Sequence, residues 1–366
     1  MSEPLRVGAT IGILGGGQLG RMLSVAASRL GLKTHILEPG ANPPAGDVAH
    51  MVTTASYDDH AALTAFGQSV DVITYEFENI PTSALDLLES LAPIHPGRQA
   101  LATSQDRLTE KTFLQDLGLQ TAPFADVADM AGLDAAIAAI GTPAILKTRR
   151  MGYDGKGQAR IMSPDDATSA LADMAGAPAI LEGFIDFSHE VSVIGARSPD
   201  GSVACYDPGE NVHEAGILRT TTVPARLSAA QRTDAVLIAA KILNALDYVG
   251  VMGVELFVTP SGLIVNEIAP RVHNSGHWTQ QGCAVDQFEQ HIRLVCGLHP
   301  GMARQHTPAC MLNILGDVWK NGAPDWAAIL QDTKAKLHLY DKGEPRPGRK
   351  MGHLTFLGKD PEDCLH

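Results

Sequence analysis

The first hundred residues alternate short apolar runs with segments of helical periodicity. An apolar run over 10–14 is followed by apolar positions at helical spacing over 19–30 and by a second run over 34–38. This alternation predicts a β-α-β unit. Two more strands and a helix would extend it into a parallel sheet with right-handed crossovers, at 50–54, 71–76 and 82–91. The N-terminal part is therefore expected to be a doubly wound, Rossmann-like α/β domain.

The pattern changes after a predicted helix over 104–117, which Gly118 ends. Apolar runs are then separated by turn residues, which predicts antiparallel hairpins and an α+β region. The expected strands cover 144–147, 158–161, 179–182, 189–197 and 202–206. A capping box at Ser228 and Gln231 opens a predicted helix that reaches Leu246, and apolar spacing from Val285 to Val295 predicts another.

Composition limits what this chain can be. Its 366 residues exceed what one hydrophobic core usually organises, so two or three domains are expected. The net charge is −13 and the basic clusters at 147–150 and 346–350 are short, which disfavours a nucleic-acid or anionic-membrane partner. Five scattered cysteines form no C-x-x-C pair, and no run of eighteen apolar residues occurs. We therefore expect a soluble cytoplasmic protein without disulfides, a zinc site or a membrane span.

A glycine cluster follows the first predicted strand. Gly15 to Gly20 matches G-x-G-x-x-G, and Glu38 ends the next strand, an arrangement typical of a nicotinamide-cofactor site. Its physics is generic, because glycines at a helix N-terminus let the backbone approach any phosphate. A phosphorylated substrate would fit equally well, and glycines that serve tight strand-to-helix packing are a further alternative.

Two apolar strands around one turn carry one glutamate each, Glu255 and Glu267. A three-residue loop at 260–262 would pair Thr259 with Leu263 and so place the glutamates opposite each other. Like charges across an antiparallel pair are destabilising unless a cation lies between them. Oxygen ligands without histidine or cysteine favour Mg²⁺. The alternative is two solvated glutamates on an exposed sheet face, which the apolar character of both strands disfavours.

A glycine-rich turn with one lysine, Gly152 to Gln158, joins two predicted strands. It is not a P-loop, because it leads into a strand and not into a helix. It could be a lid that covers nucleotide phosphates with backbone N–H groups and Lys156, or a plain hairpin turn. Lys147, at the end of the preceding strand, is either a phosphate ligand or a surface lysine.

A dense polar run, Arg271 to His277, comes shortly after Glu267. So many donors beside a proposed metal indicate an anion site for a small carboxylate or bicarbonate and a transferred phosphoryl group. The histidines could instead be hydrogen-bonded loop residues, which is the favoured interpretation for His277. Arg349 and Lys350, after a proline-rich turn, are either a solvated tail or a second phosphate clamp.

Taken together, these residues make the chain similar to the N5-carboxyaminoimidazole ribonucleotide synthase family of ATP-grasp enzymes in purine biosynthesis. The resemblance covers nearly the whole chain and rests on the segments 15–22, 106–108, 152–158, 216–220, 266–279 and 348–353. The long match at 266–279 is highly specific. The resemblance implies an ATP-grasp fold with an N-terminal doubly wound domain and a small C-terminal domain. The implied limits are 1–107 for the substrate-binding domain, 108–189 for the small subdomain with the lid, 190–300 for the large subdomain with the metal site, and 301–366 for the C-terminal domain.

The same resemblance implies an ATP-dependent carbon-nitrogen ligase with ATP and Mg²⁺ as cofactors. Bicarbonate and ATP would give carboxyphosphate, and the amine of 5-aminoimidazole ribonucleotide would be carboxylated, with ADP and phosphate released. A homodimer that passes its labile product to the downstream mutase is expected. The proton of the attacking amine could go to the departing phosphate or to Asp154.

The site residues follow from the resemblance position by position. ATP would be held by Arg107, Lys147, Gly152, Tyr153, Asp154, Gly155, Lys156, Gly157, Gln158, Glu182, Gly183, Phe184, Ile185, Glu190, His213, Asn266 and Glu267. Within this set, backbone groups of 182–185 would pair with adenine and Glu190 would bind the ribose hydroxyls. Mg²⁺ would be held by Glu255 and Glu267. Catalysis would use Arg271, His273, Asn274 and Asp154. The ribonucleotide would contact Gln18, Leu19, Glu76, Tyr153, Lys156, Arg271, Ser275, Arg349 and Lys350.

Three other functions remain open at this stage. A sibling ATP-grasp ligase would activate formate or an amino-acid carboxylate. A nicotinamide-dependent dehydrogenase would explain Gly15 to Gly20 and Glu38 but not the paired glutamates. A nucleotide-sensing module would bind ATP without turnover, which the presence of both glutamates and Arg271 disfavours.

Overall fold

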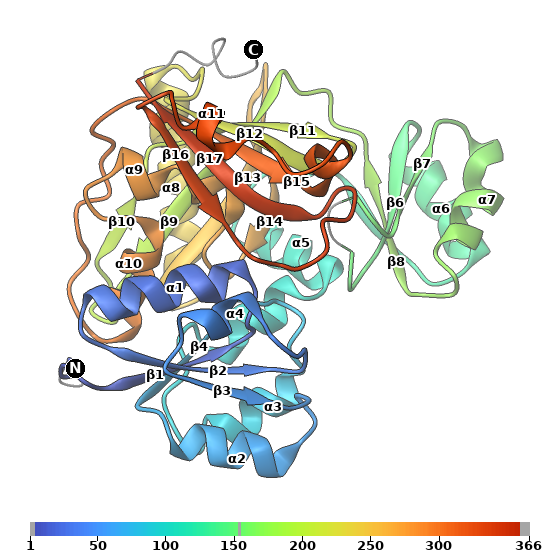
Figure 1. The fold of residues 1–366 in the computed structure, drawn as a ribbon. Helices are drawn as coiled ribbons and strands as arrows, with labels where there is room; N and C mark the ends of the chain where they lie inside the picture. Colours follow the sequence, from blue (N-terminus) through green and yellow to red (C-terminus); the bar gives the residue numbers. More distant parts are fainter. Residues whose placement is uncertain (1–3, 153–154, 359–366) are drawn as a thin grey trace.

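A computed structural model describes residues 4–152 and 155–358 of the chain, and Figure 1 shows how its elements are arranged. The N-terminal sheet is parallel, with strand order β3-β2-β1-β4. Its strands are β1 (Thr10–Leu14), β2 (Lys33–Glu38), β3 (Met51–Thr54) and β4 (Val72–Tyr75). Its helices are α1 (Gln18–Arg29), η1 (Pro44–Asp47), α2 (His60–Gln68), α3 (Thr82–Leu88) and α4 (Arg98–Ser104). The predicted doubly wound domain is confirmed.

Helix α1 joins this domain to the rest of the molecule. It lies between the parallel sheet and the large central sheet, whereas α2 and α3 lie on the outer side (Figure 1). Leu23 and Ala27 of α1 share one hydrophobic core with Ile292 and Val295. The N-terminal domain is therefore fixed against the central sheet by apolar packing.

A small antiparallel sheet carries the predicted lid, with strand order β5-β8-β6-β7. Its strands are β5 (Phe124–Val127), β6 (Ala144–Thr148), β7 (Gln158–Ile161) and β8 (Ala179–Gly183). Its helices are α6 (Met130–Ile140), η2 (Pro164–Asp166) and α7 (Ala167–Asp173), and both α helices cover the outer face of the sheet (Figure 1).

The large sheet is antiparallel throughout, with strand order β14-β13-β9-β11-β12-β15-β17-β16 and with β10 paired to β9. Its strands are β9 (His189–Arg197), β10 (Val203–Cys205), β11 (Gly209–Glu214), β12 (Ile217–Val223), β13 (Gly250–Thr259), β14 (Gly262–Ala269), β15 (Ala309–Leu315), β16 (Ala335–Leu339) and β17 (Lys350–Leu357). Its helices are α8 (Ala229–Ala245), η3 (Asn274–Gly276), α9 (Thr279–Gly282), α10 (Gln287–Val295), η4 (Gly316–Trp319) and α11 (Trp326–Ile329). The last three strands thus continue the sheet that holds the paired glutamates.

The predicted helix over 104–117 is wrong in one respect. The chain forms α4 and then α5 (Arg107–Asp116), with a break at Asp106. The Asp106 carboxylate accepts the backbone N–H groups of Leu108 and Thr109, and an Asp at this position favours the start of a new helix. By contrast, the capping box of Ser228 and Gln231 is confirmed at the start of α8.

Candidate functional site

The paired glutamates lie opposite each other on β13 and β14, but the turn between them differs from the prediction. Thr259 pairs with Gly262 and not with Leu263, so the loop is one residue shorter than expected. The Thr259 hydroxyl donates to the Gly262 carbonyl at 2.9 Å and closes this short turn. A β-bulge just after Glu255 then shifts the register by one residue, and Glu255 pairs with Glu267.

The two carboxylates have different electrostatic surroundings. Arg107 Nη1 lies 3.0 Å from Oε2 of Glu267. Burial acts to raise the pKa of the Glu267 carboxyl, but Arg107, with Lys147 and Lys111, lowers it overall. Burial and the neighbouring Glu267 raise the pKa of Glu255 to about 8. A buried carboxylate beside another carboxylate is stabilised by a cation between them. The pair therefore offers the oxygen donors and the negative charge that a divalent cation such as Mg²⁺ requires.

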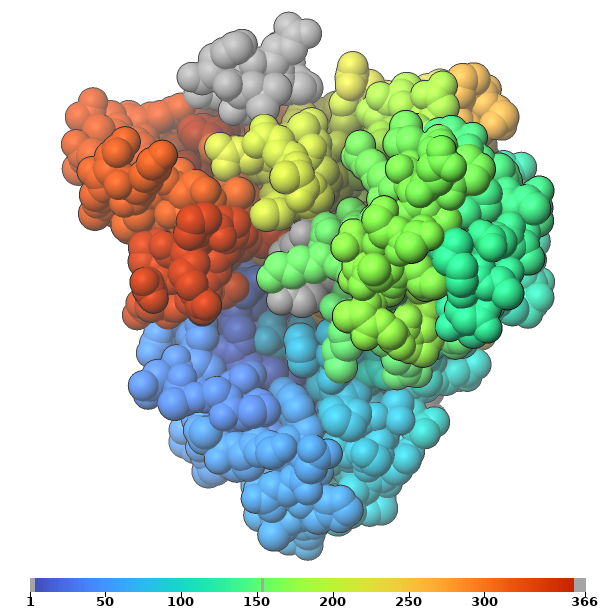
Figure 2. Space-filling view, turned by 90° about the vertical axis from the view of Figure 1, so that its right-hand side faces the viewer, coloured from blue at the N-terminus to red at the C-terminus, as the bar shows by residue number. Residues whose placement is uncertain are grey.

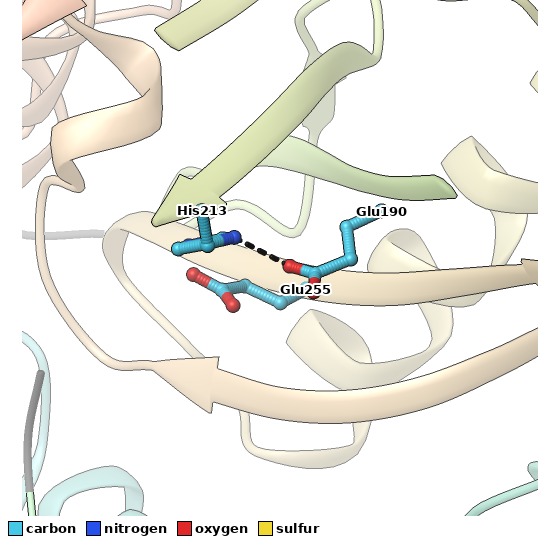
Figure 3. Close-up of side chains that lie close together, drawn as sticks. All are labelled: Glu190, His213 and Glu255. Atoms are coloured by element: carbon cyan, nitrogen blue, oxygen red, sulfur yellow. Dashed lines mark ion pairs between the residues drawn. The ribbon is translucent and has the colours of Figure 1, made fainter. Parts of the chain in front are cut away.

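His213 and Glu190 extend the site on the side of Glu255 (Figure 3). His213 Nδ1 lies 2.6 Å from Oε2 of Glu190, and ligand-type atoms of these two residues and Glu255 lie within 4.8 Å of one another. Burial opposes a charge on His213, but Glu190, together with Glu255 and Glu267, raises the pKa of the imidazole overall. The raised pKa favours the protonated imidazole, which could donate to a phosphate oxygen.

Lys147 on β6 and Glu182 on β8, both predicted to bind ATP, belong to a buried cluster of charged side chains that also includes Lys111. Lys147 Nζ lies 2.9 Å from Oε2 of Glu182, and Lys111 Nζ lies 3.6 Å from the same oxygen. Burial acts against the Glu182 carboxylate, but Lys147 and Lys111 outweigh it and lower its pKa. The Glu182 side chain thus holds two lysines in place. Lys147 lies one residue before the end of its strand, which reaches Thr148 and not Lys147 as predicted.

The segment predicted to pair with adenine, 182–185, is partly engaged by the protein itself. The N–H of Gly183 donates to the Pro123 carbonyl at 2.8 Å, and the N–H of Phe184 donates to the Pro143 carbonyl at 3.1 Å. These two donors are therefore used within the fold. The Phe184 side chain is 49% exposed and offers an apolar surface just after β8.

The predicted lid joins β6 and β7, which pair as an antiparallel hairpin. Tyr153 and Asp154 lie outside the described residues. Gly155 has a positive φ of 76°, and a Cβ at this position would lie 3.1 Å from the Ala215 carbonyl oxygen. Glycine thus permits close approach of the hairpin to the β11–β12 turn on the other side of the site. The lid residues Gly155, Lys156, Gly157 and Gln158 are exposed.

Arg271 and His273 lie between the glutamates and the N-terminal domain. Arg271 Nη2 is 2.6 Å from Oε1 of Glu78, which follows β4. His273 Nε2 is 3.3 Å from Oε1 of Glu255. Burial, with a smaller contribution from Arg271, holds the pKa of His273 well below its usual value. A neutral imidazole at this position can donate or accept one hydrogen bond at a ligand beside Glu255.

The rest of this polar run is buried beneath the site. Ser275, predicted to contact the ribonucleotide, is 1% exposed and its hydroxyl lies 2.8 Å from His273 Nδ1. Asn274 donates to Asn313 Oδ1 at 3.0 Å. His277 is fully buried, as the hydrogen-bonded interpretation requires, with Nδ1 3.1 Å from Nε2 of Gln287. These residues support His273 from below, and the contact between Ser275 and the ribonucleotide stays a prediction.

A cavity of about 610 Å³ opens between the N-terminal domain and the segment that connects β16 to β17. Figure 2 views the face where these parts, blue and red, meet the green lid-bearing part. The lining residues are Gly16, Gly17, Gln18, Glu38, Pro39, Gly40, Ala41, Asn42, Pro43, Pro44, Tyr57, Glu76, Phe77, Asp341, Lys342, Gly343 and Arg349. Its volume lies in the range of small-molecule sites.

Backbone N–H groups of the glycine cluster beside this cavity donate to carboxylates of the chain itself. Gly16 N–H donates to Glu38 at 2.8 Å, and Gly17 N–H donates to Glu76 at 2.7 Å. A Cβ at Gly17 would lie 2.8 Å from Glu76 Oε1, so the glycine makes room for this carboxylate. The helix N-terminus is thus already occupied by anionic side chains, which also disfavours binding of a dinucleotide pyrophosphate there.

Arg349, Lys350 and Leu19, which were predicted to bind the same substrate, have different surroundings in the structure. Arg349 lines the cavity, whereas Lys350, the first residue of β17, lies near enough to Glu255 and His273 to affect their ionisation. Leu19 is 5% exposed and belongs to the hydrophobic core, so its side chain does not face a ligand.

The sequence reasoning missed two lysines. Lys342 lines the cavity and follows Asp341, whose φ of 53° marks a tight turn just before the proline-rich segment. Lys111 is 1% exposed although it carries a charge. The available signal was its position on α5, three residues before the apolar Leu114 on the buried face of the helix.

The chain matches three family models along most of its length. They describe a ribonucleotide synthetase preATP-grasp domain over 8–105, an ATP-grasp domain over 112–288, and a phosphoribosylaminoimidazole carboxylase C-terminal domain over 309–366. Within the described part of the chain, no helix is long and apolar enough to cross a membrane.

Curated relatives are similar over almost the full length. The N5-carboxyaminoimidazole ribonucleotide synthase of Brucella melitensis biotype 1 is 53% identical over 356 residues, which cover 96% of this chain and 97% of that protein. The synthase of that name from Bacillus subtilis is 43% identical, with 97% and 93% covered.

Solved structures agree with these relatives. An ADP complex of an N5-carboxyaminoimidazole ribonucleotide synthetase superposes with a TM-score of 0.95 at 40% identity, covering 100% of this chain and 96% of that one. The Aspergillus clavatus synthase, solved with ADP and 5-aminoimidazole ribonucleotide, gives a TM-score of 0.90 at 34% identity, with 98% and 96% covered.

Proposed function

The chain belongs to the N5-carboxyaminoimidazole ribonucleotide synthase family of ATP-grasp ligases, and we propose that it carboxylates the amine of 5-aminoimidazole ribonucleotide with ATP and bicarbonate. The observation that carries this proposal is the pairing of two sites. The proposed nucleotide site contains the carboxylates of Glu255 and Glu267 with cationic side chains around them. A separate cavity, lined by Glu76, Lys342 and Arg349, lies beside it. Arg271, which is paired with Glu78 next to that cavity, connects them.

The nucleotide site fits ATP with Mg²⁺. Glu255 and Glu267 supply carboxylate oxygens, and the raised pKa of Glu255, caused by burial and by Glu267, reflects a repulsion that a divalent cation would relieve. Arg107, Lys147 and His213 provide positive charge around them. When bound, Mg²⁺ would neutralise charge that develops on the transferred phosphoryl group.

The cavity is proposed to hold the ribonucleotide. Among its described lining residues, Lys342 and Arg349 are suited to the 5′-phosphate, because both side chains donate charge-assisted hydrogen bonds. Glu76 is held by the N–H groups of Gly17 and Gly20 and faces the cavity, where it could accept a hydrogen bond from the amine. Gln18 would contribute a polar contact at the same wall.

Bicarbonate would be activated between the two sites. Arg271 and His273 lie where a carboxyphosphate would meet the amine, and Lys350 adds positive charge. The hairpin 152–158 would close over the nucleotide and exclude water, because hydrolysis of carboxyphosphate would waste ATP. The ligand assignments of Asp154 and Tyr153, outside the described residues, remain proposals.

We also propose that the enzyme acts in the cytoplasm as a homodimer and passes its product to the downstream mutase. The support for the last point is chemical, since a carbamate on an aromatic amine is labile and a prompt transfer would preserve it.

Labelled bicarbonate tests the reaction directly. Purified protein with Mg·ATP, 5-aminoimidazole ribonucleotide and ¹³C-bicarbonate should give a new carbamate carbon resonance, whose integrated intensity corresponds to one carbamate for each ADP formed. A matched sample without ATP should not form this carbamate at the same rate. ADP formation without a labelled carbamate would overturn the proposal.

A further inference from the structure

Helix α5 directs three charged side chains toward strand β14. Arg107, Glu110 and Lys111 are spaced i, i+3 and i+4 and therefore share one face of the helix. Glu110 is 2% exposed and Lys111 is 1% exposed. Charged side chains are seldom buried this deeply unless they have partners. Their partners are the backbone groups on either side of Glu267.

The backbone at Glu267 is irregular. Glu255 pairs with Glu267, but the next residue of β13 pairs with Val265, so Asn266 is the extra residue of a β-bulge. A bulge interrupts the hydrogen-bond ladder and redirects the side chains beside it. Without other partners, this segment of β14 would be poorly fixed at Asn266 and Glu267, which are both predicted ligands.

Glu110 and Lys111 supply those partners. Lys111 Nζ donates to the carbonyl oxygen of Asn266 at 2.6 Å. The N–H of Ile268 donates to Glu110 Oε1 at 2.7 Å. The residue between them, Glu267, is therefore held by one hydrogen bond before it and one after it, both from the same helix.

Lys111 also reaches the small sheet. Its Nζ lies 3.6 Å from Oε2 of Glu182, which in turn holds Lys147 Nζ at 2.9 Å. One buried ammonium group thus connects the bulge of the large sheet with the lysine at the end of β6. The two ligand-bearing strands belong to different sheets, and this connection fixes their relative position.

We propose that Glu110 and Lys111 are positioning residues for phosphoryl transfer. They hold the bulge so that Asn266 and Glu267 face the nucleotide, and Lys111 aligns Lys147 with them through Glu182. The inference rests on the proposed function, because it takes Glu267 as a metal ligand and Lys147 as a phosphate ligand. Residues that orient metal ligands from behind typically contribute ten- to hundredfold to metal affinity or activity.

The direct test replaces Lys111 by methionine, which keeps the length of the side chain and removes the donor and the charge. Mn²⁺ binding in the presence of ADP, followed by electron paramagnetic resonance, should weaken about 10- to 100-fold. The KM for 5-aminoimidazole ribonucleotide should change less than about twofold, because the cavity is lined by other elements. Thr112→Ala is the matched control, since Thr112 is exposed and its hydroxyl bonds within α5, to the Leu108 carbonyl. It should leave both values unchanged.

A second pair of variants keeps the proposal falsifiable if Lys111→Met does not fold. Glu110→Gln retains an oxygen that accepts the Ile268 N–H and should keep Mn²⁺ affinity within about threefold of wild type. Glu110→Met removes the acceptor, so it should lose affinity tenfold or more and should show faster hydrogen exchange at Ile268 without any ligand.

Unchanged Mn²⁺·ADP binding in a folded Lys111→Met or Glu110→Met protein would overturn the proposal. Equal losses in Mn²⁺·ADP binding and in ribonucleotide KM would also overturn it, because they indicate general destabilisation. Failure of the proposed function looks different: the wild-type protein would then bind Mn²⁺·ADP but release no phosphate with bicarbonate and the ribonucleotide.

Discussion

Replacement of Glu255 by glutamine separates the functional role of this residue from its effect on stability. The carboxylate lies directly opposite Glu267 and is buried, and these two causes raise its pKa to about 8. Glutamine has nearly the same shape but no charge. We therefore expect Glu255→Gln to abolish most activity while it stabilises the ligand-free protein at high pH.

The magnitudes follow from the geometry. Side chains directly opposite in an antiparallel pair have Cβ atoms about 5 Å apart. At an effective dielectric constant of about 20, two unit charges at this separation repel by about 3 kcal/mol. The variant should thus gain up to about 3 kcal/mol in unfolding free energy above pH 8, or a few degrees in Tm. Loss of one of the two carboxylates that would hold the cation at the reacting phosphates should reduce kcat by about a hundredfold or more.

The sign of the pH dependence is fixed by the raised pKa. A protonated Glu255 carries no charge for Glu267 to repel. Its favourable contribution to the free energy of unfolding is therefore fully present below about pH 4.5, the usual pKa, and is lost as the pH rises through about 8, the pKa in the folded protein. The Tm of the variant minus that of the wild type should therefore be near zero at pH 5 and positive at pH 8.5.

Two assays check this prediction on the same preparations. Thermal unfolding is recorded at pH 5 and pH 8.5 without ligand, and phosphate release from Mg·ATP is recorded with saturating substrates. The stabilisation of the wild type by Mg·ADP should also be largely absent in the variant. Turnover close to wild type in a folded variant, or a Tm below that of the wild type at pH 8.5, would refute the reasoning.

Three more predictions concern the other parts of the site. Glu267→Gln should lower turnover at least about a hundredfold. In the double variant with Glu255→Gln, steady-state kinetics should show a loss smaller than the product of the two single losses. Mg·ATP should slow amide exchange over 155–158, and equal exchange with and without nucleotide would contradict closure of the hairpin. Arg349→Met should raise the KM for 5-aminoimidazole ribonucleotide about 10- to 100-fold with little change in the KM for ATP, and the opposite pattern in steady-state kinetics would contradict the cavity assignment.

Much of the fold could be predicted because it follows from regular patterns. The alternation of apolar runs gives the parallel N-terminal sheet, and the Ser228 capping box gives the start of α8. The pairing of Glu255 with Glu267 was predicted correctly, although two local errors cancelled: the turn is one residue shorter, and a bulge at Asn266 restores the register. A three-residue turn, and a two-residue turn followed by a bulge, both place Glu255 opposite Glu267. The sequence alone could not distinguish these two arrangements.

The parts that could not be predicted depend on contacts between distant residues. The glycines at 15–20 look like a phosphate cradle until Glu76, which lies about sixty residues further on, is seen to occupy their N–H groups. Glu110 and Lys111 look like ordinary surface charges on a helix, and only their burial against β14 reveals their partners. Such partners are set by tertiary packing, which no local pattern records.

The central claim is that this chain couples ATP cleavage to the joining of bicarbonate and a ribonucleotide amine. Phosphate release from Mg·ATP, measured with 5-aminoimidazole ribonucleotide and bicarbonate each added or withheld, tests it most directly. Full turnover should require both, because the nucleotide site and the cavity lined by Lys342 and Arg349 bind different substrates. Phosphate release that the ribonucleotide does not stimulate, formate replacing bicarbonate at an equal rate, or oxidation of NADH would contradict the account.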